Sequence, residues 1–421
     1  MEDILNLRYS IDTFYFLVMG AFVMWMAAGF AMLEAGLVRA KNTTEILTKN
    51  IVLYAVACIM YMLVGYNIMY PEEAVNSFWP GIAFLLGADN DPATVVTAAA
   101  DAWYDGSYYS GRSDFFFQVV FVATAMSIVS GAIAERMKLF PFLAFAAVMT
   151  GFIYPLQGFW KWGGGFLDEA GFLDFAGSGV VHLTGAAAAL AGVILLGARK
   201  GKYGKNGEIH PIPGANMPLA TLGTFILWFG WFGFNGGSEL IVSNAGEANS
   251  VAAVFVNTNA AAAGGVVAAL FTARLAFGKA DLTMVLNGAI AGLVGITAEP
   301  LTPSPELATL IGAVAGVLAV FSILALDKLR LDDPVGAISA HGVCGIWGLF
   351  AVTLSNPDAT ISAQFLGIGV IFGFVFVASF IIWSIIKATV GIRVSEEEEY
   401  AGVDISECGL EAYPEFTSAG K

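Results

Sequence analysis

The chain of 421 residues contains only three cysteines and three histidines. Cys58, Cys344 and Cys408 show neither the paired spacing of zinc ligands nor the pattern of a disulfide framework. Charged residues make up 13% of the sequence, too few to cover the surface of a soluble domain of this length. Acidic residues outnumber basic ones, 34 to 19, so nucleic acid is not an expected partner. The cysteines thus indicate neither a zinc site nor a disulfide scaffold. We expect no metal ion, no cofactor and no enzymatic activity.

Long apolar runs are abundant instead. Hydrophobic residues form 57% of the chain and the mean hydropathy is +0.74, which predicts an all-α protein that crosses a cell membrane many times. The first run, 13–33, is long enough to span and follows an acidic segment, so it does not resemble a cleavable signal peptide. Uncharged runs of about 20 residues predict eleven transmembrane helices. They lie at 12–34, 48–70, 114–134, 139–160, 178–198, 217–237, 250–273, 282–298, 307–326, 336–355 and 362–386.

The basic residues orient these helices. Loops rich in Lys and Arg stay on the cytoplasmic side. Placing the N-terminus outside puts most of the basic residues inside and leaves only Arg8, Arg112 and Lys161 outside. We therefore expect the N-terminus outside and the C-terminus inside.

Two histidines lie within apolar spans, each eight residues after an aspartate: Asp174 and His182, then Asp333 and His341. Ionisable groups inside a membrane usually face a cavity or a partner, although two unrelated core histidines would give the same pattern. His182 falls on the fifth span and His341 on the tenth. Five spans in each half predict two inverted repeats, followed by a last long helix.

The aspartates begin their helices on opposite faces, where a carboxylate caps a helix N-terminus. Direct contact with a substrate is the alternative. Eight helical residues rise about 12 Å, so each histidine approaches the bilayer centre from its own side. The two imidazoles can therefore meet.

Segments in nearly every span resemble the ammonium transporter (Amt/Mep/Rh) family, on its Amt branch. They are GFAMLEAGLVRAKN from Gly29, SGAIAERMKLFPF from Ser130, FWKWGGGFL from Phe159, LDFAGSGVVHLTGAAAAL from Leu173, GWFGFNGGS from Gly230, FVNTNAAAAGG from Phe255, NGAIAGLVGIT from Asn287 and DDPVGAISAHGVCGIWG from Asp332. The resemblance implies an eleven-helix protomer, a homotrimer with one pore per subunit, and ammonium as substrate.

The resemblance also implies site residues. His182 and His341 resemble the paired pore histidines, and Asp174 resembles the acidic residue that maintains the site. The outer recruitment site for the ion looks like Trp162, Phe121 and Ser238, and the two rings that close the pore look like Phe121 and Phe234. Glu34 departs from many bacterial relatives, which have an aromatic residue there, and we expect it to alter packing at the outer mouth.

Simpler roles stay open for several of these residues. Phe121 and Phe234 could be ordinary core rings, and Trp162 could belong to an interfacial aromatic belt. Ser238 could return a hydrogen bond to its own helix. His210, in a loop, is expected to be solvated.

The chemistry of the ion suggests a mechanism. Ammonium and potassium have the same charge and similar sizes, but only ammonium donates directed hydrogen bonds and can lose a proton. A dry pore makes an ion very costly to transfer, far more than a neutral molecule. We expect the ion to lose its proton near the rings or the first histidine and to cross as ammonia. Whether the proton crosses as well, along the imidazoles, stays open.

The last segment, 391–421, is polar and acidic, so we expect a cytoplasmic tail after a membrane domain at 1–390. It resembles the Amt tail, which packs along neighbouring subunits and can contact PII-type signalling proteins; a disordered acidic tail is the alternative. Some relatives serve as ammonium sensors with a signalling domain after this tail, so a sensor is the rival function. A channel for neutral gas of the Rh type is a second rival.

Overall fold

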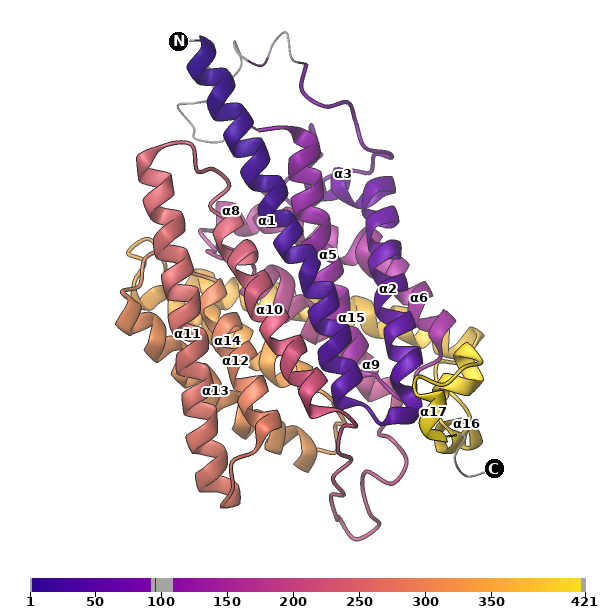
Figure 1. Cartoon of the computed structure of the whole chain (residues 1–421). Helices are drawn as coiled ribbons and strands as arrows, with labels where there is room; N and C mark the ends of the chain where they lie inside the picture. The colour runs from indigo at the N-terminus through magenta and orange to yellow at the C-terminus, as the bar shows by residue number, and fades with distance from the viewer. Residues whose placement is uncertain (1, 92–94, 96–108, 418–421) are drawn as a thin grey trace.

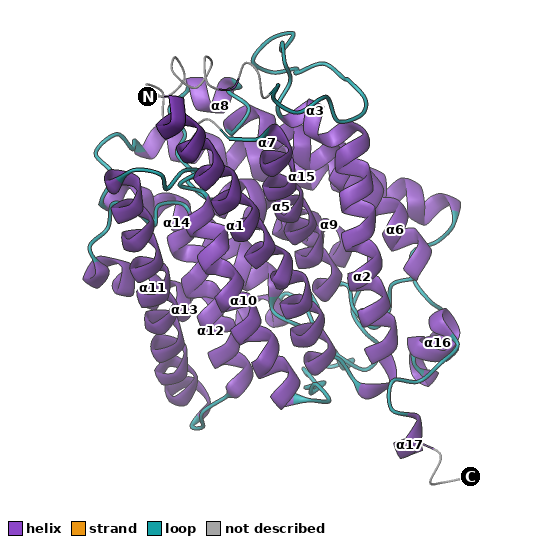
Figure 2. Ribbon diagram, turned by 45° about the horizontal axis from the view of Figure 1, so that its top comes forward, coloured by secondary structure: helices purple, strands orange, loops and turns teal. Residues whose placement is uncertain are grey.

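The computed structural model describes residues 2–91, 95 and 109–417. Long helices lie side by side, and the two ends of the chain lie at opposite ends of the bundle (Figures 1 and 2). The α-helices are α1 Glu2–Leu37, α2 Thr43–Met60, α3 Tyr66–Met69, α5 Gly111–Ala132, α6 Leu139–Val148, α7 Tyr154–Lys161, α8 Phe166–Glu169, α9 Thr184–Leu196, α10 Met217–Gly237, α11 Ala245–Phe277, α12 Leu282–Thr297, α13 Pro305–Lys328, α14 Cys344–Ala351, α15 Ile361–Thr389, α16 Glu396–Ala401 and α17 Pro414–Thr417. Over the described residues the only extended pairings are isolated bridges. The all-helical prediction is confirmed.

Several spans change from α-helical to π-helical geometry along their length. The π-helical segments are η2 Tyr61–Gly65, η3 Met149–Ile153, η4 Ser178–Leu183, η5 Ile338–Val343 and η7 Asp404–Cys408, and the 3-10 segments are η1 Ala40–Asn42 and η6 Val352–Leu354. Segments η2 and η3 continue α2 and α6, whereas η4 and η5 begin the helices of α9 and α14. π-Helical turns are often found at functional sites. The sequence pattern predicted none of them.

Each of the eleven expected segments contains a helix, but not all are equally long. Nine described helices are long and apolar enough to cross a membrane, whereas Leu282–Thr297 and Ile338–Leu354 are shorter apolar helices. The 16 residues of Leu282–Thr297 rise about 24 Å, less than the hydrocarbon core of about 30 Å. These two helices are buried within the bundle, which explains why they need not be as long as helices that face lipid.

Glycines let the first helices of the two expected halves, α1 and α10, pack closely. A Cβ atom on Gly223 would lie 2.2 Å from the backbone nitrogen of Leu33, and one on Gly36 would lie 2.4 Å from that of Ala220. No larger side chain fits at either position without moving a backbone. Within a membrane, helices have no hydrophobic driving force for association. They associate instead through the close van der Waals packing that small residues allow.

A buried ion network joins the loops at the C-terminal end of the bundle. The Arg199 guanidinium donates to both carboxylate oxygens of Asp332 at 2.9 Å and lies 3.3 Å from Glu135, which also pairs with Arg39. Burial opposes ionisation of Asp332, but Arg199 and Arg136 lower its pKa well below the ordinary value. The network fixes the loops after α1, α5 and α9 to the segment before η5.

The acidic tail packs against its own membrane domain. Asp404 accepts a hydrogen bond from the Glu45 backbone N–H at 2.8 Å, and Glu407 accepts one from the Leu139 N–H at 2.8 Å. Glu399 is buried and pairs with Arg393 at 2.7 Å. These three carboxylates of the tail therefore satisfy helix starts and a cation instead of remaining fully solvated.

Candidate functional site

The two intramembrane histidines sit in matching local structures. Asp174 and Asp333 are each followed after three residues by a glycine with positive φ, Gly177 at 109° and Gly336 at 79°. A π-helical segment begins within two residues of each glycine and carries the histidine five residues after it. Glycine adopts positive φ readily because it has no Cβ. The same turn therefore starts both helices.

The carboxylates of both aspartates accept hydrogen bonds from backbone N–H groups at these helix starts. Asp174 accepts hydrogen bonds from the N–H groups of Gly177 at 3.2 Å, Gly179 at 2.9 Å and Val180 at 2.8 Å. Asp333 accepts them from Val335 and Gly336, and from Ile338 at 2.7 Å. Such capping satisfies donors that have no partner within the helix.

His182 and His341 meet in the interior. Their Nδ1 atoms lie 3.1 Å apart and both side chains are buried. In a contact between two neutral imidazoles one Nδ1 donates and the other accepts, so the two rings carry opposite tautomers. The Nε2 atom of His182 is buried without a hydrogen-bond partner, which leaves one nitrogen available to a molecule in the passage.

Aromatic rings enclose one side of the pair. Trp231 and Phe234 stack on His182 with centroid distances of 5.0 and 5.2 Å, and Phe234 contacts Phe121 at 4.2 Å. Phe121 and Phe234 are at most 1% exposed. The two phenyl rings therefore separate the histidines from the space beyond Phe121.

That space is a cavity of about 310 Å³, which we call the aromatic vestibule. It is lined by Tyr70, Tyr109, Asp114, Phe117, Gln118, Phe121, Trp162, Phe175, Ser238 and Leu240. The Trp162 ring lies edge-on to Phe121 at 6.2 Å, and its N–H donates to the Asp174 backbone carbonyl at 3.0 Å. The Asp174 turn thus holds the indole in place.

The Ser238 hydroxyl donates to the Phe234 carbonyl, one turn back on α10, at 2.8 Å. This is the local hydrogen bond considered as the simpler role for Ser238. With its proton directed to the helix, the oxygen still has lone pairs that accept from a donor in the vestibule. The local bond therefore leaves Ser238 suited to bind an N–H group.

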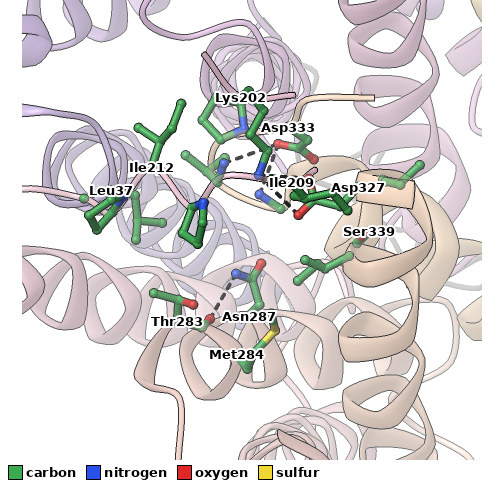
Figure 3. A pocket seen from close by; sticks show the side chains of 18 of the residues that line it. Leu37, Lys202, Ile209, Ile212, Thr283, Met284, Asn287, Asp327, Asp333 and Ser339 are labelled. Atoms are coloured by element: carbon green, nitrogen blue, oxygen red, sulfur yellow. Dashed lines mark hydrogen bonds and ion pairs between the residues drawn. The ribbon is translucent and has the colours of Figure 1, made fainter. Parts of the chain in front are cut away.

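A further cavity lies beside His341, on the other side of the histidine pair. A cavity of about 10 Å³ is lined by His341, Phe30, Glu34, Asn287 and Val335, among others. Asn287 and Val335 also line a larger cavity of about 320 Å³, which we call the polar vestibule. Figure 3 shows Asp333, Lys202 and Asp327 on one side of this vestibule and Thr283, Met284 and Asn287 of α12 on the other.

The structure brings together the residues that the sequence pointed to. Successive ring contacts connect Trp162, Phe121, Phe234, His182 and His341. Ser238 lines the aromatic vestibule with Trp162 and Phe121, and Asp333 lines the polar vestibule. The sequence analysis missed Trp231, whose N–H donates to Thr297 at 2.8 Å while its ring covers His182. Its place three residues before Phe234, on the same helix face, was an available signal.

The expectation for Glu34 was wrong. Glu34 lies near the end of α1, where it accepts hydrogen bonds from Asn50 and Ser130 and lines the small cavity beside His341. It is absent from the lining of the aromatic vestibule. The comparison with relatives did not reveal which end of the bundle Glu34 occupies: α1 has 36 residues, so its last turn, which carries Glu34, lies far from its first.

No group of three or more His, Cys, Asp or Glu residues in the described part of the chain is arranged to hold a metal ion. The described geometry places two cavities on either side of aromatic rings and a pair of buried imidazoles. In apolar surroundings, the loss of water costs an ion far more than it costs a small neutral polar molecule.

Comparisons with known proteins agree on one family. Residues 14–413 match the sequence profile of the Ammonium Transporter Family. The chain is 42% identical to the ammonium transporter Amt2 of Archaeoglobus fulgidus, over 98% of this chain and 90% of that protein. It is 34% identical to Amt1 of Methanocaldococcus jannaschii, over 96% and 98%.

Solved structures are similar as well. A structure titled Sensor Amt Protein aligns with a TM-score of 0.87 and 34% identity, covering 96% of this chain and 99% of that one. The crystal structure of Candida albicans Mep2 aligns with a TM-score of 0.80 and 28% identity, covering 97% and 92%.

Proposed function

The chain belongs to the ammonium transporter family, and on that premise we propose that it takes up ammonium beside Trp162, removes its proton and passes ammonia along His182 and His341. Multi-pass insertion in the cell membrane follows from the family and from the long apolar helices. One observation supports the proposed mechanism: two buried imidazoles are in direct contact, 3.1 Å apart, in the interior between the aromatic and the polar vestibule.

The aromatic vestibule suits a cation that donates hydrogen bonds. The faces of Trp162 and Phe121 attract a cation by about 0.5 to 2 kcal/mol, depending on how far water is removed. Potassium gains this energy as well, but only ammonium also donates a hydrogen bond to the Ser238 oxygen. The vestibule is thus a moderate filter, and the main discrimination lies deeper.

The rings and the imidazoles supply that deeper discrimination. The free energy of transfer from water into an apolar passage is many kcal/mol for an unpaired ion, whereas ammonia loses only its few hydrogen bonds to water. Ammonium enters by giving up a proton, and potassium has none to give. The bare nitrogen of His182 is placed to accept, and the Nδ1 contact allows the proton to continue to His341. Net transport of ammonium is then electrogenic.

The orientation and assembly form part of this proposal. We place the N-terminus outside, the C-terminus inside, and all eleven helices across the membrane as two inverted halves plus α15. The aromatic vestibule then faces outside, and the polar vestibule faces the cytoplasm together with Arg199 and Lys202, in accord with the location of basic residues. We also propose a homotrimer with one passage per subunit.

The tail at 391–421 follows a membrane domain at 1–390 in this proposal. A PII-type signalling protein is its proposed partner, because the tail contacts the helix starts at Glu45 and Leu139 and can transmit a change there. A sensor of ammonium is the second candidate function, favoured by the similarity to the structure titled Sensor Amt Protein. A signalling domain in the native reading frame after Lys421, together with absence of current, would support the sensor.

Current recordings on proteoliposomes fused to a solid-supported membrane test the proposal. We expect an ammonium jump to evoke a current and a potassium jump to evoke none. His182→Ala and His341→Ala should lose the ammonium current or admit potassium. His210→Ala is the matched control, because His210 is exposed in a loop and lines neither vestibule. A double His182/His341 alanine variant with the rate and selectivity of the parent contradicts the mechanism.

A further inference from the structure

Glu34 is a buried carboxylate that the mechanism above does not use. Its side chain is near the end of α1, and the residue is 1% exposed. Oε1 accepts from the Ser130 hydroxyl at 2.7 Å and Oε2 from the Asn50 amide at 2.9 Å. Both donors are neutral, and among the described residues no Lys or Arg forms an ion pair with it. A carboxylate in this setting is costly to keep ionised.

The contact with Ser130 fits both protonation states of Glu34. The Ser130 hydroxyl oxygen lies 2.7 Å from Glu34 and also 2.7 Å from the Ser127 carbonyl. A hydroxyl has one proton, so it can donate to only one of them at a time. If Glu34 is ionised, Ser130 donates to it. If Glu34 is protonated, Glu34 donates to Ser130, and Ser130 turns its proton to the Ser127 carbonyl. Neither state requires a heavy atom to move.

A small cavity joins Glu34 to the histidine pair. Glu34 and His341 both line the cavity of about 10 Å³, which is the space of about one water molecule. Nδ1 of His341 is occupied by His182, so Nε2 is the ring nitrogen left for this side. The absence of a side chain at Gly131 leaves room for Val335 and Glu34 at this cavity, because a Cβ there would come within 2.5 Å of Val335 and 3.4 Å of the Glu34 carboxyl carbon.

The small cavity adjoins the polar vestibule, because Asn287 and Val335 line both of them. Glu34 thus lies between the histidine pair and the polar vestibule, on the way that a proton leaving the histidines would take. A hydrogen-bonding role alone does not require a carboxylate here. A glutamine side chain would accept from Asn50 through its oxygen and donate to Ser130 through its nitrogen.

We propose that Glu34 accepts the proton that leaves the histidine pair and releases it to the polar vestibule. In this route an N–H bond of ammonium breaks and its proton joins Nε2 of His182. The Nδ1 proton of His182 moves to Nδ1 of His341, and the Nε2 proton of His341 passes through one water to the Glu34 carboxylate. Ammonia remains in the passage and the positive charge moves with the proton. Each passage inverts both tautomers, which must revert before the next.

This inference rests on the proposed electrogenic transport, so its test has two parts. The first compares ammonium-evoked currents of the parent, Glu34→Gln and Glu299→Gln in proteoliposomes. Glu299 is the matched control, because it is buried, accepts hydrogen bonds from backbone N–H groups and Asn356, and lines neither vestibule nor the small cavity. General acid–base groups contribute about 100-fold or more to a rate. We expect a loss of about that size for Glu34→Gln alone, at an unchanged unfolding temperature.

The second part observes the proton directly. Infrared difference spectra of the parent across a pH titration should contain a carboxylic acid C=O band that Glu34→Gln lacks and Glu299→Gln keeps. If the Gln variant does not fold, Ser130→Ala serves instead, since it removes the hydroxyl that adapts to both states. We expect Ser130→Ala to slow the current and enlarge its solvent isotope effect.

The outcomes separate the two ideas. A parent without ammonium current rejects electrogenic transport, while the infrared band still decides whether Glu34 takes up a proton. A parental current in Glu34→Gln, or spectra in which no band depends on Glu34, overturns the proposal for Glu34.

Discussion

Replacing Asp174 distinguishes a helix cap from a ligand of the ion. The carboxylate accepts hydrogen bonds from the backbone N–H groups of Gly177, Gly179 and Val180, and all three donor residues are buried. A buried donor left without a partner costs about 1–3 kcal/mol. Asp174→Ala therefore lowers the free energy of unfolding by about 3–9 kcal/mol. This is a large part of the 5–15 kcal/mol that is typical of a folded protein. We expect this variant to fail to assemble or to unfold at a much lower temperature.

Asp174→Asn is the informative change. With its amide oxygen at the place of Oδ2, asparagine keeps the bonds from Gly179 and Val180 and loses the long one from Gly177. The lost bond costs about 1–3 kcal/mol and the lost charge at the helix start about 0.3–1 kcal/mol, so the total cost is about 1–4 kcal/mol. We expect a folded protein with a modestly lower unfolding temperature and a current that persists at a reduced rate.

Unfolding in detergent, followed by tryptophan fluorescence, and ammonium currents of the same preparations provide the measurement. Asp333→Asn is the matched control, because Asp333 caps the other histidine helix through Val335, Gly336 and Ile338. The reasoning is refuted if Asp174→Asn keeps parental stability and loses all current while Asp333→Asn transports normally. In that case the negative charge acts on the ion itself.

Two further predictions concern the aromatic vestibule and its edge. Trp162→Leu removes the cation-attracting ring, so we expect a several-fold higher apparent KM for ammonium in current recordings; unchanged kinetics for ammonium and methylammonium would count against a role at this site. Burial and then Glu247 raise the pKa of Glu239 from 4.5 to about 7. Because the folded-state pKa is raised, this group stabilises the protein fully below about pH 4.5, and its contribution is lost as the pH rises through about 7. Unfolding temperatures measured from pH 5 to 8 should fall less in Glu239→Gln than in the parent, and parallel curves would contradict the assignment.

The sequence predicted much of the candidate site because its signals are local or repeated. Uncharged runs located the helices, and the matched spacing of Asp174 to His182 and Asp333 to His341 predicted that the imidazoles meet, as they do at 3.1 Å. Segments η4 and η5 escaped prediction, because hydrophobic periodicity does not distinguish a π-helical turn from an α-helical one over six residues.

Glu34 shows the limit of motif-based reasoning in another way. Its partners Asn50 and Ser130 lie on two other helices, and its cavity is shared with His341, 307 positions later in the chain. Contacts of that kind depend on how α1 packs against α2 and α5. No spacing within one segment encodes them.

The contact between the Phe121 and Phe234 rings bears on how turnover is limited. At a centroid distance of 4.2 Å the two rings are in contact, so in the proposed route each ammonia molecule needs a brief swing of one or both side chains to pass. Such swings do not require the helices to rock against one another, and the glycine contacts between α1 and α10 resist sliding. The proposed route therefore predicts a current that saturates with substrate, as in a carrier, without movement of the backbone, as in a channel.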